Sequence, residues 1–372
     1  MALKIIVIGG GIIGLTHAVT AREAGHDVTL FERDGRALGA SVRNFGTIWP
    51  IGCAFGPERE QALFGVKRWK EIAAPAGIWK SAQGSLSLAY RDEAWSVLQE
   101  FCGAQEGFEL LKPEEVARRY PAARKQGLRG ALFSGDELLI HAPTAIPALA
   151  DYARNLGVTI HMGTPVAGVH ADRVDTADGR TFSFDQLVVA AGEEMRVFFP
   201  EELSVAQVHP CRLQMMRTVC QPAGFELGAI LVSDLTLCHY PAFRNCPSIG
   251  KLRERLTAEL PEHNRWGVHV IAAQHQDGTI TIGDSHEYGL DLPPESMTLV
   301  DELILGALND FVHIPHMRIA LRWQGTYLKS KTGQTQVVLH PRERVTMVTA
   351  MGGLGMTLSW GLARRIVQSW NS

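Results

Sequence analysis

The sequence predicts an α/β protein built from two interleaved domains, and three observations lead to this prediction. Residues 5–32 run as a strand, a glycine turn, a helix and a second strand. Residues 209–288 instead alternate apolar and polar positions, which is typical of an antiparallel sheet. Residues 345–370 repeat the order of the first segment, with a strand, a glycine loop and a helix. Because the strand, glycine turn and helix occur at both ends of the chain and the antiparallel sheet lies between them, we expect discontinuous domains.

The opening segment carries the spacing G-x-G-x-x-G at Gly9, Gly11 and Gly14. In such a unit the first glycine permits a tight turn, the second lets the backbone approach a pyrophosphate, and the third lets the helix lie close to the sheet. Free N–H groups at the helix start bind the phosphates. Glu32 ends the second apolar run, where an acid accepts hydrogen bonds from ribose hydroxyls. This context predicts a Rossmann-like dinucleotide-binding domain.

The elements between the two ends follow from local pattern and turn residues. The helix over 145–156 ends at Gly157, and Asp178-Gly179 predicts a hairpin turn. The run 184–192 predicts a buried strand that ends in Ala-Ala-Gly, where a dinucleotide backbone can pass closely. In chain order, the other expected elements are a helix over 63–74, strands over 85–89, 158–161, 166–169, 173–176, 213–219, 236–240, 267–274 and 279–283, and a helix from 293 to 311.

The C-terminal glycine loop, at residues 352–355, precedes a predicted helix over 356–370. The N-terminus of this helix carries the positive end of its dipole, as the N-terminus of the first helix does. The predicted division gives residues 1–80, 141–207 and 320–372 to the nucleotide domain. Residues 81–140 and 208–319 form the second, antiparallel sheet plus helix domain.

The composition excludes several classes of protein. The chain has 372 residues, 46% of them hydrophobic, and a net charge of −3, so it carries no basic surplus for nucleic acid. No apolar run reaches the length of about 18 residues that a membrane span needs. The apolar start is too short for a signal peptide and lacks a cleavage site, so we expect a cytoplasmic location.

The cysteine and histidine spacing predicts no metal site. The six cysteines are scattered without a C-x-x-C pair, and His313 and His316 bracket a proline that spoils a helical ligand pair. The sequence predicts no particular oligomeric state.

Three motifs together resemble one family: GGGIIG with Glu32, VVAAG at 188–192 and GGLGMT at 352–357. They are similar to the D-amino-acid oxidase, glycine oxidase and sarcosine oxidase superfamily of FAD-dependent amine oxidoreductases. The resemblance spans the chain and implies a glutathione-reductase-type, Rossmann-like FAD-binding domain interleaved with a substrate domain. More narrowly, SVRNFGTIWPIG at 41–52 and TIGDSHEYG at 281–289 resemble a bacterial subgroup associated with aminophosphonate breakdown.

The resemblance implies FAD contacts in every motif. In chain order they are Gly9, Gly11, Ile12, Ile13 and Gly14 at the pyrophosphate, Glu32 and Arg33 at the ribose, Ser41, Arg43, Asn44 and Phe45 along and under the cofactor, Val166 at the adenine, Ala191 and Gly192 beside it, and Gly353, Leu354, Gly355, Met356 and Thr357 at the flavin. Relatives with covalent flavin use a histidine or cysteine near the ring. Residues 43–45 offer neither, so we expect non-covalent FAD, although Cys53 leaves a covalent link open.

The implied reaction is oxidation of a C–N bond in a small-molecule amine. A hydride passes from the carbon next to a neutral amine to flavin N5, water hydrolyses the resulting imine, and O2 or another acceptor reoxidises the flavin. Positioning dominates such chemistry, because the reacting carbon must lie about 3–3.5 Å from its acceptor. We therefore expect the site residues to act chiefly as substrate holders.

One departure from the family pattern concerns the substrate. Many relatives carry W-x-G-x-R, whose arginine clamps a carboxylate, but here the fifth position of the segment 323–327 is Tyr327. A hydroxyl cannot replace a bidentate guanidinium. Arg322 and Lys329 flank the segment, and a phosphonate suits two separate cations and a tyrosine. The expected substrate is therefore a small aminophosphonate, similar to 2-aminoethylphosphonate and including N-methylated forms.

Other functions stay open. An oxidase of glycine, sarcosine or D-amino acids is the close alternative, and an NAD(P)H-using flavin monooxygenase or reductase is the second. A flavin-binding scaffold without activity is a third.

The candidate site residues fall into two groups. The catalytic candidates are Tyr327, Arg322, His286, Asp284 and His239, and the substrate-binding candidates are Asn44, Trp49, Tyr240, Gln274, Tyr288 and Lys329. Asp284 and His286 are two positions apart, so they are expected to share a strand face and form an ion pair that tunes the histidine. A polar turn and a half-buried structural histidine are the alternatives for Asp284 to Tyr288 and for His239.

Overall fold

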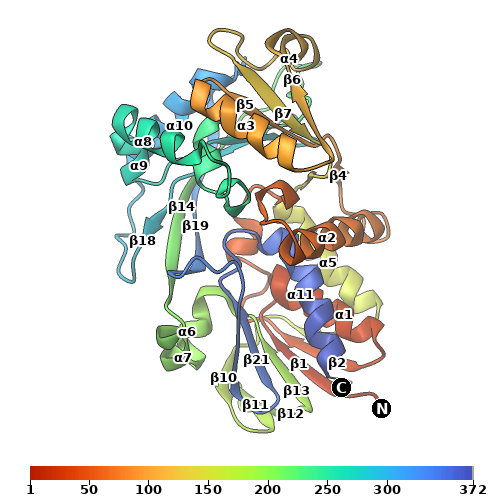
Figure 1. The fold of residues 1–372 in the computed structure, drawn as a ribbon. Helices are drawn as coiled ribbons and strands as arrows, with labels where there is room; N and C mark the ends of the chain where they lie inside the picture. Colours follow the sequence, from red (N-terminus) through yellow and green to blue (C-terminus); the bar gives the residue numbers. More distant parts are fainter. Residues whose placement is uncertain (371–372) are drawn as a thin grey trace.

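The computed structural model describes residues 1–370, and two large β-sheets organise them (Figure 1). The six-stranded sheet has the order β20-β21-β13-β1-β2-β9. Its strands are β1 Lys4–Ile8, β2 Asp27–Phe31, β9 Thr159–His161, β13 Gln186–Val189, β20 Val337–Arg342 and β21 Val345–Thr349. All neighbouring strands except β20 and β21 run parallel. Segments from both ends and the middle of the chain therefore share one sheet.

Both faces of this sheet are buried, as is usual for parallel strands. Ile5 and Val7 of β1 pack into one hydrophobic cluster, whereas Ile6 and Ile8 pack into another. Helices that contribute to the first cluster include α1 Ile12–Glu23, α2 Pro57–Ala73, α5 Ala142–Asn155 and α11 Gly355–Ser369. The small sheet β10 Val166–Val169, β11 Arg173–Thr176 and β12 Thr181–Ser183 contributes to the second. The glycine turn after β1 is thus supported from both sides.

The nine-stranded sheet lies beyond the helices, in the upper half of Figure 1. Its strands are β5 Ser85–Ala89, β6 Phe108–Leu111, β7 Gly130–Ser134, β14 Val208–Thr218, β15 Ile230–Val232, β16 Ile271–Gln274, β17 Ile280–Gly283, β18 Glu287–Tyr288 and β19 Ile319–Ser330. Its helices are α3 Asp92–Ala104, α4 Pro113–Arg119, α8 Ile249–Glu259, α9 Pro261–Arg265 and α10 Thr298–Phe311. The remaining elements are β3 Thr47–Ile48, β4 Lys80–Ser81, β8 Leu138–Ile140, α6 Met195–Phe198 and α7 Pro200–Val205.

The long strands β14 and β19 form an antiparallel ribbon that runs from one half of the molecule to the other (Figure 1). Their pairing extends from Val208 opposite Ser330 to Thr218 opposite Ile319. The predicted domain boundary at residue 320 falls inside β19, which pairs within the nine-stranded sheet. The division into domains otherwise stays a prediction, while the mixed α/β fold is confirmed.

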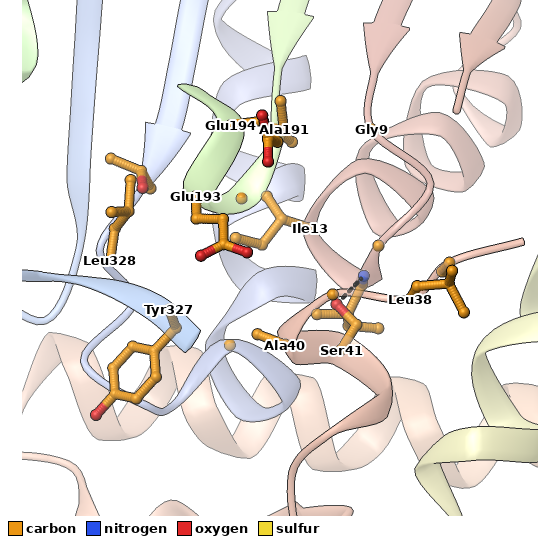
Figure 2. A pocket seen from close by; sticks show the side chains of 18 of the residues that line it. Gly9, Ile13, Leu38, Ala40, Ser41, Ala191, Glu193, Glu194, Tyr327 and Leu328 are labelled. Atoms are coloured by element: carbon orange, nitrogen blue, oxygen red, sulfur yellow. Dashed lines mark hydrogen bonds between the residues drawn. The ribbon is translucent and has the colours of Figure 1, made fainter. Parts of the chain in front are cut away.

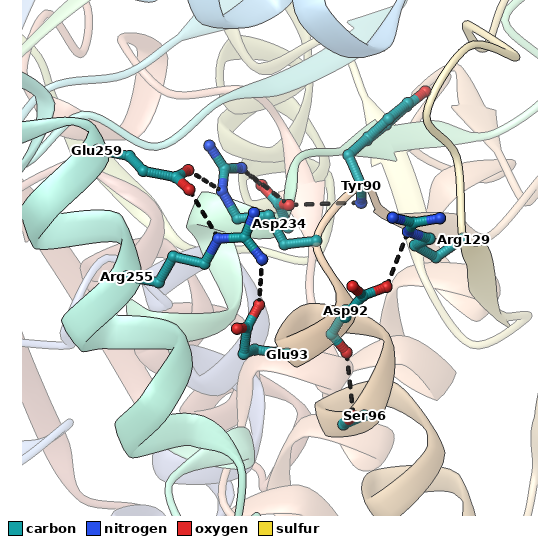
Figure 3. A network of polar contacts seen from close by, with 9 residues as sticks. Tyr90, Asp92, Glu93, Ser96, Arg129, Asp234, Arg255 and Glu259 are labelled. Carbon is teal, nitrogen blue, oxygen red and sulfur yellow. Dashed lines mark hydrogen bonds and ion pairs between the residues drawn. The ribbon is translucent and has the colours of Figure 1, made fainter.

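The strand expected over 236–240 is wrong, because this segment begins as the short helix η4, Asp234–Cys238. A buried acid, Asp234, anchors the segment. Asp234 pairs with Arg91 Nη1 at 3.0 Å, and Arg91 Nε contacts Glu259 at 2.9 Å. Arg255 joins Glu259 to Glu93, so the network links α3, α8 and η4 (Figure 3). The network fixes the backbone just before His239.

None of the helices within residues 1–370 is long and apolar enough to cross a lipid bilayer.

Glu137 gives a test of the fold through the pH dependence of stability. Its buried carboxylate accepts hydrogen bonds from Ile51 N at 3.0 Å and Ser85 Oγ at 3.1 Å, and burial raises its pKa to about 7. As the pH rises, the Glu137 carboxyl therefore ionises in the unfolded chain before it ionises in the folded one. The free energy of unfolding falls by on the order of 3 kcal/mol between about pH 4.5 and pH 7.

We expect Glu137→Gln to gain stability relative to the wild type across that interval, as measured by urea unfolding at several pH values. Glu114→Gln, on the exposed surface of α4, is the control and should leave the pH dependence unchanged. A constant difference between Glu137→Gln and the wild type at all pH values would contradict the assignment.

Candidate active site

A pocket of about 370 Å³ opens at the carboxyl ends of β1 and β13, where nucleotide sites form in parallel sheets. It is lined by six stretches of chain: the glycine turn, residues 31–44, 164–166, 190–198, 325–328 and 349–356. Figure 2 shows these stretches meeting around one elongated space, with Gly9 and Ser41 at one side and Tyr327 at the other.

The glycine turn leaves no room for side chains. Gly9 has φ +109°, and a Cβ there would lie 2.4 Å from Ala190 O. A Cβ on Gly14 would lie 1.9 Å from Gly9 O, so only glycine lets α1 pack this closely. A Cβ on Gly11 would lie 2.8 Å from Ser41 Oγ and would project into the pocket wall. The turn is therefore shaped for a backbone that must approach a ligand.

Hydrogen-bond donors face the pocket at this turn. The N-cap residue of α1 is Gly11, which has no side chain, and Ile12 N donates to Ser41 Oγ at 2.9 Å (Figure 2). Glu32 is held against the turn, because Gly10 N donates to Oε2 at 2.7 Å and Asp34 N donates to Oε1 at 3.0 Å. The positive end of the α1 dipole and the acid after β2 thus occupy the positions that phosphates and a ribose require.

The C-terminal glycine loop closes the other end of the pocket. Gly352 and Gly353 have φ of +57° and +81°, and α11 begins at Gly355 without a side-chain cap. Met356 and Gly355 line the pocket. The start of α11 therefore points a positive dipole at the ligand, which stabilises negative charge there by roughly 0.5–2 kcal/mol.

Most of the predicted FAD residues line this one pocket. The exceptions are Gly14, Phe45, Leu354 and Thr357. Gly14 acts through helix packing, and Thr357 Oγ1 accepts a hydrogen bond from Trp49 N at 2.8 Å. Cys53 is buried and lies outside the lining, so non-covalent FAD stays our prediction.

Sequence reasoning missed several lining residues, among them Leu38, Glu193 and Glu194. Glu194 pairs with Arg33 at 2.6 Å, and Glu193 projects into the pocket in Figure 2. Burial raises the pKa of Glu193. These residues lie outside the glycine motifs, so the sequence gives no signal for them. Glu193 and Glu194 do directly follow Gly192, at the end of the Ala-Ala-Gly run.

Tyr327 joins the pocket to a second group of polar residues. Its ring lines the pocket, and its hydroxyl lies within hydrogen-bonding reach of Cys211, the residue opposite it on β14. Lys329, two positions further on β19, donates to Tyr288 Oη at 3.0 Å. Burial raises the pKa of Tyr327 and lowers that of Lys329. The half-buried Tyr327 lines the pocket, and the half-buried Lys329 lies two positions further along the same strand.

Three histidines lie next to this group, with ring centroids 4.0 to 5.0 Å apart: His239, His269 and His286. Tyr240 lies 6.0 Å from His269 and 6.1 Å from Trp49, between ring centroids. His269 was missed from the sequence, because a lone histidine before a strand carries no signal.

The expected ion pair between Asp284 and His286 is wrong. Asp284 Oδ1 lies 3.2 Å from His269 Nε2 on the neighbouring chain segment, and His286 Nδ1 contacts Gly267 O at 3.1 Å. Cross-strand neighbours lie closer than residues two apart on one strand, which are separated by about 6.6 Å. Burial raises the pKa of Asp284 and lowers that of His269.

Two candidate residues lie elsewhere, and we correct their assignment. Arg322 is half exposed and pairs with Asp301 at 2.7 Å. It precedes Tyr327 by five strand positions, which places it about 17 Å away on the opposite face. Gln274 donates to Phe225 O and accepts from Leu227 N, so both ends of its amide support a loop. Asn44 lines the pocket, but its amide bonds Ala40 O and Gly46 N.

The fold and the pocket define a Rossmann-type dinucleotide-binding protein. Residues 4–369 match the FAD dependent oxidoreductase (DAO) family, and the chain belongs to it. The chain is 29% identical over 348 residues to a glycine oxidase of Bacillus licheniformis, covering 90% of this chain and 84% of that protein. The protein is therefore an FAD-dependent oxidoreductase.

Solved structures share the whole fold. A glycine oxidase from Geobacillus kaustophilus superposes with a TM-score of 0.78 at 18% identity, covering 99% of this chain and 95% of that one. An L-α-glycerophosphate oxidase from Mycoplasma pneumoniae with FAD bound superposes with a TM-score of 0.75 at 19% identity, covering 100% and 95%.

Gly14→Ala tests the cofactor cradle. The added methyl meets backbone, which cannot move aside as a side chain can, so we expect the purified variant to retain little FAD. Absorbance near the flavin bands, relative to protein, measures occupancy. Gly306→Ala, in open space on α10, is the matched control and should retain FAD fully. Equal occupancy in the two variants would contradict the role of the Gly14 contact.

Proposed function

We propose that this protein oxidises a small amine at the carbon next to nitrogen, in the manner of an amino acid oxidase. The observation that carries the proposal is the position of Tyr327 in the lining of the pocket that fits FAD, in a chain similar to a glycine oxidase over 90% of its length. Lys329 lies two positions further along the same strand and contacts Tyr288. Bound FAD would accept the hydride, and the chain supplies binding and orientation.

Tyr327 and Lys329 are suited to hold the anionic group of the substrate. Burial raises the pKa of Tyr327, so its hydroxyl stays protonated and can donate a hydrogen bond. Lys329 carries a positive charge on the same face of β19, and Tyr288 fixes its Nζ at 3.0 Å. Two donors on one strand face thus fix one end of the substrate, while its C–H is left to face the flavin.

The nearby histidines do not act as cations at neutral pH. Burial lowers the pKa of His286 to about 3 and lowers those of His239 and His269 well below their usual value. They can donate or accept hydrogen bonds but add no charge. Only a substrate amine that has lost its proton can release a hydride, and the positive charge of Lys329 disfavours a protonated amine nearby.

An aminophosphonate is a second candidate substrate. It is favoured by Tyr327, which stands where many relatives place the arginine that clamps a carboxylate. Lys329 is a point charge, which suits a tetrahedral phosphonate as well as it suits a planar carboxylate.

Anaerobic mixing with a panel of amines separates these substrates. Glycine, sarcosine and D-alanine form one arm, and 2-aminoethylphosphonate with its N-methyl form makes the other. We expect bleaching of the flavin absorbance by the amino acid arm, and faster bleaching by the phosphonate arm would establish the second candidate. Bleaching by NADPH alone, with no amine active, would contradict both and favour a monooxygenase or reductase.

Lys329→Met tests the anion contact. Loss of a charged hydrogen bond costs about 1.5–3 kcal/mol, so substrate affinity should fall roughly 10- to 150-fold with a smaller change in the limiting rate of flavin reduction. Lys331→Met, on an exposed turn beyond β19, is the matched control. An unchanged substrate dissociation constant in Lys329→Met would place the anion elsewhere.

A further inference from the structure

The three histidines beside the substrate residues come from three separate segments. His239 follows η4, His269 precedes β16, and His286 lies between β17 and β18. Their ring nitrogens lie within 4.8 Å of one another. We propose that His239, His269 and His286 bind one divalent transition metal ion, with Zn²⁺ as the reference, and leave one coordination position open.

The hydrogen bonds around the cluster leave a free nitrogen for such an ion on two of the rings. His286 Nδ1 contacts Gly267 O at 3.1 Å, which directs Nε2 toward the cluster. His269 Nε2 lies 3.2 Å from Asp284 Oδ1, which leaves Nδ1 free. A second ring nitrogen held by a carbonyl or a carboxylate is the usual support of a metal-binding histidine.

Unsatisfied buried atoms point to a missing ligand at the same place. His269 Nδ1 has no hydrogen-bond partner among residues 1–370, and neither His269 Nε2 nor Asp284 Oδ1 makes a well-aligned hydrogen bond there. Both side chains are almost fully buried, at 4% and 5% exposure. Leaving a buried polar atom unpaired costs about 1–3 kcal/mol, so a ligand that satisfies these atoms would be bound favourably.

The electrostatics favour an imidazole-preferring metal over Ca²⁺ or Mg²⁺. The cluster offers three imidazole nitrogens, which are ligands that Zn²⁺ and other transition metal ions prefer. The cluster holds one carboxyl group, Asp284, whereas Ca²⁺ prefers six or more oxygens. The charge of Lys329 acts on His269 and His286 and opposes any weakly bound cation.

The backbone around the cluster is rigid enough to hold a metal. His269 N donates to Asp284 O at 3.1 Å, Asp284 N donates to His269 O at 2.8 Å, and His286 N donates to Trp266 O at 2.8 Å. Zn–N bonds of about 2.0–2.1 Å place ligand nitrogens about 3.4 Å apart, so side-chain rotations of roughly an ångström complete the site.

The open position would take water or an anionic oxygen. During turnover this oxygen ligand would be the anionic group of the substrate, close to Lys329. That assignment rests on the proposed function. Metal binding itself does not depend on that function, and it is measured without any substrate.

The test uses untagged holoenzyme with oxidised FAD, freed of metal by a chelator and then titrated with Zn²⁺. We expect one equivalent to bind saturably, and the zinc X-ray absorption edge to show nitrogen ligands at about 2.0–2.1 Å. His269→Gln and His286→Gln should abolish this binding, and Asp284→Asn should weaken it about 10- to 100-fold.

The matched control is His170→Gln, because His170 also pairs with a carboxylate, Asp175, at 2.7 Å but lies on the exposed β10–β11 hairpin. Flavin absorbance and the melting temperature show whether each variant is folded. The absorption edge of the wild type remains decisive where a variant fails to fold. No saturable binding to the wild type, or equal binding by folded His269→Gln and wild type, overturns the proposal, whatever the panel of amines shows.

Discussion

The contact on which the rest of the structure depends is the approach of α1 to β1 at Gly9 and Gly14. A Cβ at Gly14 would stand 1.9 Å from Gly9 O, so the helix can begin directly above the strand end only if that carbon is absent. This packing brings the start of α1 over the edge where β1, β2 and β13 end together. This packing of α1 on β1 positions the phosphate site relative to the acid after β2 and the Ala-Ala-Gly after β13.

The β14–β19 ribbon carries this geometry into the other half of the molecule. Alternate residues of β19 face opposite sides, so Tyr327 and Lys329 share one face while Arg322 faces the other. The same ribbon places Cys211 opposite Tyr327 and Arg212 opposite Thr326. The substrate residues are therefore positioned by strand register relative to a pocket that is built by the first and last segments of the chain.

The fold and the FAD pocket could be predicted from the sequence because their signals are local. Glycine spacing, the acid at Glu32 and the loop at 352–355 each report a close backbone approach that depends on a few neighbouring residues. In the half that contains the nine-stranded sheet, the sequence predicted elements and site residues less well. Residues 236–240 look like a strand until the buried Asp234 and its arginine are known, and Gln274 looks like a site residue until its amide is seen to bond a loop.

The histidine cluster shows most clearly what spacing cannot reveal. His239, His269 and His286 are separated by 30 and 17 positions. The pairing of the segments around β16 and β17 brings His269 and His286 together, and η4 places His239 beside them. Metal sites with short spacing can be read from one helix or loop, whereas this cluster depends on sheet register. The pairing that buries the ends of β16 and β17 thus also sets where His269 and His286 lie, while the ion pairs of Asp234 fix the segment that carries His239.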